Sequence, residues 1–61
     1  YAIQSTDCEV ENLLFDGVIV KEGGIYNFEQ TKGKNVLIKN VINPAYKNAN
    51  ICTDSMCPEI I

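Results

Sequence analysis

The sequence contains no histidine, no tryptophan and no uninterrupted apolar run longer than four residues. Because a membrane-spanning helix needs about 20 predominantly apolar residues in succession, we predict no membrane insertion. Histidine is the usual base for a serine or cysteine nucleophile, so its absence argues against such sites. Basic residues are also few: five Lys and Arg against eight Asp and Glu give a net charge of −3 without a basic cluster. Such a chain neutralises few phosphates, so we predict no nucleic-acid partner.

The 61 residues are 46% hydrophobic, which is the balance of one small globular domain spanning residues 1–61. A chain this short buries only about 60% of its unfolded surface, so it often needs a disulfide, a metal or a partner. Three cysteines, Cys8, Cys52 and Cys57, are available. Without histidine they do not supply the four ligands of a zinc site, so we predict no metal and no cofactor.

One disulfide with one unpaired cysteine is the simplest use of three cysteines, and it indicates an oxidising compartment. The chain begins at Tyr1 rather than at methionine, which fits a mature form after removal of a signal peptide. We therefore expect a secreted protein.

Carboxylates gather near the amino-terminal end, at Asp7, Glu9 and Glu11. A pair of carboxylates is the minimum for glycoside hydrolysis. Glu9 and Glu11 are two residues apart in a predicted strand, so they share its solvent face, and a catalytic pair would also need a cleft. We interpret them as a solvated face and predict no catalytic residues and no enzymatic activity.

Short apolar segments alternate with polar residues and are separated by Gly, Asn, Asp and Pro, which is typical of strands. Asp16-Gly17, between two apolar segments, is a strong hairpin signal. The pattern predicts an all-β fold, a small five- to six-stranded antiparallel sandwich or barrel with one disulfide. The expected strands cover residues 8–15, 18–20, 25–30, 35–41, 49–53 and 59–61.

An internal repeat supports an alternative fold. Residues 11–19 align with residues 34–42, with identical Asn, Leu, Val and Ile at a constant offset of 23. Repeats of this length mark solenoids, and the pattern resembles a coil of the right-handed parallel β-helix of polysaccharide lyases and polygalacturonases. Since 61 residues make fewer than three such coils, this alternative implies a fragment of a larger carbohydrate-active or adhesive protein. It requires residues 12–19 and 35–42 to stack in parallel.

A second resemblance follows the order of Cys8, a strand at 18–20, a Gly-Gly turn, Phe28 on the third strand and Cys52. This order resembles the MAX effectors of plant-pathogenic fungi, which include the ToxB-type toxins. The resemblance implies a six-stranded sandwich with a Cys8–Cys52 disulfide, although Cys8–Cys57 stays open as an alternative. Cys57 is then the spare thiol, which could link two copies into a disulfide-bonded dimer.

The resemblance implies a secreted, non-enzymatic effector or toxin that binds a host protein through a sheet edge or face. Residues 18–20 and 25–30 are the candidate edges, and flanking charged residues would set specificity. The expected partner-binding residues are Val18, Val20, Lys21, Glu22 and Glu29. Besides the solenoid, a further alternative is a small secreted inhibitor with its loop at residues 43–50.

Overall fold

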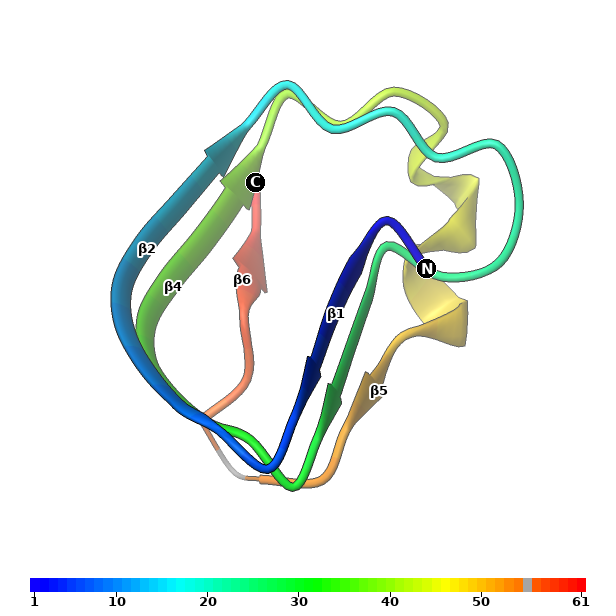
Figure 1. Cartoon of the computed structure of the whole chain (residues 1–61). Coiled ribbons are helices and arrows are strands. Elements are labelled where there is room, and N and C mark those ends of the chain that lie inside the picture. The colour runs from blue at the N-terminus through cyan, green and yellow to red at the C-terminus, as the bar shows by residue number, and fades with distance from the viewer. Residues whose placement is uncertain (55) are drawn as a thin grey trace.

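The computed structural model describes residues 1–54 and 56–61, and most of them are extended (Figure 1). This confirms the all-β prediction. A 3-10 helix, η1, covers Pro44–Ala49, within the segment 43–50 that was considered as an inhibitory loop. The strands are β1 (Ile3–Thr6), β2 (Glu9–Asp16), β3 (Tyr26–Glu29), β4 (Lys32–Lys39), β5 (Ile51–Cys52) and β6 (Glu59–Ile60).

The strands form two three-stranded sheets, β1-β3-β5 and β2-β4-β6, and every pairing is parallel. Figure 1 shows the two sheets facing each other across the interior. The predicted antiparallel arrangement was therefore wrong. At Asp16-Gly17 the chain does not form a hairpin. The Gly17 N–H donates instead to the Lys39 carbonyl at the end of β4, at 3.0 Å. A glycine with a φ of 86° serves a solenoid corner as well as a hairpin turn.

The chain winds as a stack of coils. Ile3 pairs with Tyr26 and Leu13 with Val36, and Ile19 bridges Ile42, always 23 residues apart. We call residues 1–23 the first coil, 24–46 the second coil and 47–61, without residue 55, the third coil. The parallel stacking of residues 12–19 on 35–42 that the internal repeat requires is thus present.

The corners of the first two coils repeat as well. Asn12 and Asn35 both have a left-handed backbone, with φ of 58° and 55°, and the Asn35 Nδ2 group donates to Asn12 Oδ1 at 2.9 Å. Asparagine, aspartate and glycine accept this conformation more readily than most residues, so the repeated sequence produces repeated corners. The stacked left-handed pairs are Asp7 with Gln30, Asn12 with Asn35, and Gly17 with Asn40.

The core lies mainly in the second coil. Tyr26 and Phe28, which alternate on β3, belong to the core, with ring centroids 5.7 Å apart in an edge-to-face arrangement. Phe28 is 1% exposed and Ile38 is fully buried. The other buried apolar residues are Val20, Ile25, Tyr26 and Val36.

The disulfide joins Cys52 to Cys57, and Cys8 is an exposed free thiol. One disulfide was expected, but the Cys8–Cys52 pairing was wrong, and Cys57, predicted to be the spare thiol that links a dimer, is paired. Cys52 lies beside Phe28, which in turn lies beside Ser5, so Cys52 is two strand spacings, about 10 Å, from the first coil. A disulfide needs Cα atoms within about 7 Å, so a first-coil cysteine does not reach Cys52.

Candidate functional site

The stack has two unlike ends. β1 and β2 each lie at one edge of their sheet, while β5 and β6 lie at the opposite edges. We call the side of β1 and β2 that faces away from the second coil the open edge. β2 is eight residues long, whereas β5 and β6 have two residues each. Among the described residues no strand pairs with the open edge, so an extended row of backbone donors and acceptors is free there.

The interior of the first coil is covered on one side only. The inward side chains of the second coil are almost all buried, because a coil lies on either side of them. Their first-coil counterparts are only half-buried. These half-buried side chains are Ile3, Val10, Leu13, Phe15 and Val18.

On the outer face of β2 and β4, the acidic residues lie on β2 and the basic residues lie on β4. Glu9 and Glu11 of β2 lie opposite Lys32 and Lys34 of β4 in the parallel register. Asp16 and Lys39 repeat the pattern at the other end of the strands. Opposite charges that face each other across strands stabilise a pairing modestly, by about 0.2–1 kcal/mol per pair. The outward charges of the open edge are therefore all negative, and those of its neighbour all positive.

A surface hollow of about 380 Å³ lies over the first halves of β2 and β4. We call it the outer hollow. Its lining joins the two glutamates and two lysines to a small apolar floor. The lining residues are Glu9, Val10, Glu11, Lys32, Gly33, Lys34 and Met56.

Glu9 and Glu11 are exposed, as expected of a solvated strand face. Within residues 1–54 and 56–61, no group of three Cys, Asp or Glu side chains is arranged to hold a metal ion. The carboxylates and ammonium groups that line the outer hollow offer ionic contact and hydrogen bonding.

The five predicted partner-binding residues do not form one surface. Val20 is 2% exposed and belongs to the core, so its side chain is not available to a partner. Lys21 and Glu22 are exposed near the end of the first coil, and Val18 is half-buried. Glu29 is exposed, but it ends β3, the central strand of its sheet.

The candidate edge at residues 25–30 was wrong, because β3 lies between β1 and β5. A meander places consecutive strands side by side, whereas in this stack the neighbours are one coil apart. Residues 18–20 do lie in the first coil and are bridged on one side only, through Ile19 and Ile42. The longest edge strand, β2, was not among the predicted edges, although the 23-residue offset was the signal that could have identified it.

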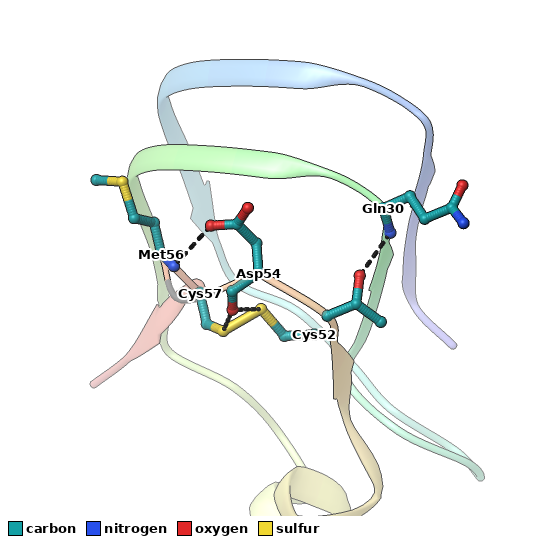
Figure 2. The surroundings of a disulfide bond; sticks show 6 residues. Gln30, Cys52, Asp54, Met56 and Cys57 are labelled. Carbon is teal, nitrogen blue, oxygen red and sulfur yellow. Dashed lines mark hydrogen bonds between the residues drawn. A yellow bond between two sulfur atoms is a disulfide. The ribbon is translucent and has the colours of Figure 1, made fainter.

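The third coil closes the opposite end. Figure 2 shows the Cys52–Cys57 bridge folded around Asp54, whose carbonyl oxygen lies 3.1 Å and 2.9 Å from the two sulfur atoms. The Asp54 carboxylate accepts from the Met56 N–H at 3.0 Å. The Thr53 hydroxyl accepts from the Gln30 N–H at 2.7 Å, which ties this loop to the second coil. Short strands and a cross-linked loop leave little free edge here.

No protein-family model, curated protein or solved structure matches the chain significantly. In the part of the chain that the structure describes, no helix is long and apolar enough to cross a membrane.

Proposed function

We propose that the chain is a non-enzymatic protein-binding module that takes a strand of its partner onto the open edge. The observation that carries this proposal is the half-buried interior of the first coil beside the eight-residue strand β2, which pairs with β4 on one side and with no described strand on the other. A parallel strand added there would bond to the free backbone groups of β2. It would also cover the inward side chains Val10, Leu13 and Phe15, which the second coil covers from one side only. Strand addition of this kind is a common mode of peptide recognition.

The biological setting of this function is also a proposal. The Cys52–Cys57 disulfide supports an oxidising compartment, in keeping with secretion. A host protein as the partner, and with it a role as effector or toxin, is supported only by the sequence resemblance, whose antiparallel sandwich is not the fold found here.

A strand peptide tests the binding mode. The probe is QGQNVLIQ, which is the β4 sequence with its lysines replaced by glutamine, and QGPNVPIQ is a control that cannot donate a full ladder. We expect the probe to slow hydrogen exchange of the β2 amides and to leave β5 and β6 unchanged. If neither peptide slows hydrogen exchange of the β2 amides, the proposal is contradicted.

A second candidate function is carbohydrate binding by a solenoid segment of an adhesive or carbohydrate-active protein. Parallel coils at a 23-residue offset and the polar lining of the outer hollow favour it. Millimolar neutral and acidic oligosaccharides should then shift the amide NMR signals of Glu11 and Lys34, and a Lys34→Gln variant should respond less. Unchanged spectra with every oligosaccharide would exclude this candidate.

A further inference from the structure

We infer that the open edge selects a basic strand: a parallel segment with Lys or Arg on its outer face and apolar residues facing the core. The inference rests on the proposed function and names the class of partner. It combines the acidic outer row of β2, the one-sided cover of the first coil and the asparagine ladder that ends at Asn12.

The first step is charge. Every charged residue of β2, namely Glu9, Glu11 and Asp16, is acidic. A strand added at the open edge would lie about 4.8 Å from β2, the same spacing at which β4 lies on the other side. Lysines at the matching outward positions would repeat the arrangement of Lys32, Lys34 and Lys39, whereas carboxylates would face carboxylates.

The second step is the ladder at the corner. Asn35 donates its Nδ2 group to the Oδ1 atom of Asn12, and this leaves the Nδ2 group of Asn12 as a donor for the next level of the stack. A partner strand with asparagine at the same position would accept that bond. The left-handed corner at Asn12 would be continued in the same way as it is between the first two coils.

A second copy of this chain fits the open edge poorly. Two β2 strands placed edge to edge would bring two acidic rows together. A head-to-tail stack would present the third coil, whose short strands offer few backbone bonds and whose charged residues after the 3-10 helix, Asp54 and Glu59, are again acidic. The charge pattern therefore favours a different, basic partner over self-association.

The chain itself contains the required pattern, because β4 has the sequence KGKNVLIK with lysines outward, asparagine at the corner and apolar residues inward. This peptide is the probe, QGQNVLIQ is its neutral counterpart, and EVENLLFD, the β2 sequence, is the charge-reversed control. Binding is measured by fluorescence anisotropy at low salt, and hydrogen exchange locates the bound peptide.

We expect the basic peptide to bind with a Kd about tenfold lower than that of the neutral peptide, because three opposed charge pairs add modest free energies. The acidic peptide should bind more weakly than both. At 1 M salt, where the Debye length is about 3 Å, the basic and neutral peptides should become nearly equal.

Matched variants locate the effect. The Glu9→Gln/Glu11→Gln double variant should lose most of the preference for the basic peptide. The Glu29→Gln/Glu59→Gln variant removes the same charge from other strands and should keep it. Circular dichroism confirms that both variants are folded before binding is compared.

The outcomes separate the two proposals. Equal binding of the basic and neutral peptides at the open edge would overturn charge selection and leave the strand-binding function standing. Absence of binding by all three peptides would overturn both. Concentration-dependent self-association through β2, seen by sedimentation and hydrogen exchange, would replace the basic partner with a second copy.

Discussion

The first and third coils each contribute one edge strand to both sheets, but the two ends of the stack differ in strand length and cross-linking. The third coil has two-residue strands, a disulfide and a loop tied to Gln30, whereas the first coil contains the eight-residue β2. The inward apolar residues of both coils are half-buried. A solenoid end without protection is an aggregation hazard, and proteins usually cover or charge such edges. The third coil offers only two-residue strands, and its disulfide cross-links the loop between them. The first coil carries a row of carboxylates, which discourages self-pairing and still permits a basic strand.

The largest expected effect contrasts core truncations in the second and first coils. Phe28→Ala should lower the free energy of unfolding by about 3–5 kcal/mol, enough to abolish folding of so small a core. Phe15→Ala should cost about half as much, because Phe15 is half-buried at the open edge. Urea denaturation followed by circular dichroism measures both. Equal losses would mean that the first coil is covered in solution, and the difference between the ends would disappear.

The disulfide tests how far the third coil depends on its cross-link. A loop closed over a sequence separation of 5 should contribute about 2 kcal/mol, so Cys52→Ala/Cys57→Ala should lower the free energy of unfolding by that amount. Cys8→Ala is the matched control and should have almost no effect, since this thiol is exposed and free. Intact mass after alkylation should show one reactive thiol, at Cys8. Three reactive thiols in protein from its native source would mean that the disulfide does not form there, so that the third coil is not cross-linked.

Substitutions at the stacked left-handed corners should have a smaller effect on the free energy of unfolding. Asn35→Ala should cost about 1–2 kcal/mol, because alanine tolerates a φ of 55° poorly and loses the bond to Asn12. Asn35→Gly keeps the backbone conformation and loses only the side-chain bond, so its cost should be clearly smaller. Thermal melts of the two variants separate these contributions. If both variants lose the same stability, the ladder outweighs the left-handed corner, and an asparagine in a partner strand becomes more valuable at the open edge.

Strand positions were accessible from the sequence, but strand direction was not accessible from local pattern. The segment predicted at residues 8–15 is close to β2, and that at 35–41 overlaps β4, because alternation of apolar and polar residues reports burial of one face. Alternation is the same in parallel and antiparallel sheets, and a left-handed corner at Gly17 resembles a hairpin turn. Only the long-range offset between Asn12 and Asn35 distinguishes the two folds.

The candidate site was predictable to the same extent as the fold: features of a single strand were accessible from the sequence, and the order of neighbouring strands was not. The exposure of Glu9 and Glu11 was predictable from their spacing. Their position opposite Lys32 and Lys34, and the openness of β2, depend on which strands are neighbours, and local pattern does not report this. The cysteine pairing failed for the same reason, since it also depends on the order of the stack.

The smallest effect concerns Tyr26, which lies in the covered second coil. Burial raises the pKa of its hydroxyl above the ordinary value of 10.0, because the charged phenolate is poorly solvated there. The folded state therefore holds this proton more tightly than the unfolded chain. Its contribution to stability is complete below pH 10 and is lost as the pH rises through the folded-state pKa. Tyr26→Phe should show a shallower decline in stability above pH 10 than the unmodified protein, measured by urea denaturation at a series of pH values. Parallel declines would indicate that the hydroxyl reaches solvent, and that the second coil is less completely covered by its two neighbours than its core residues suggest.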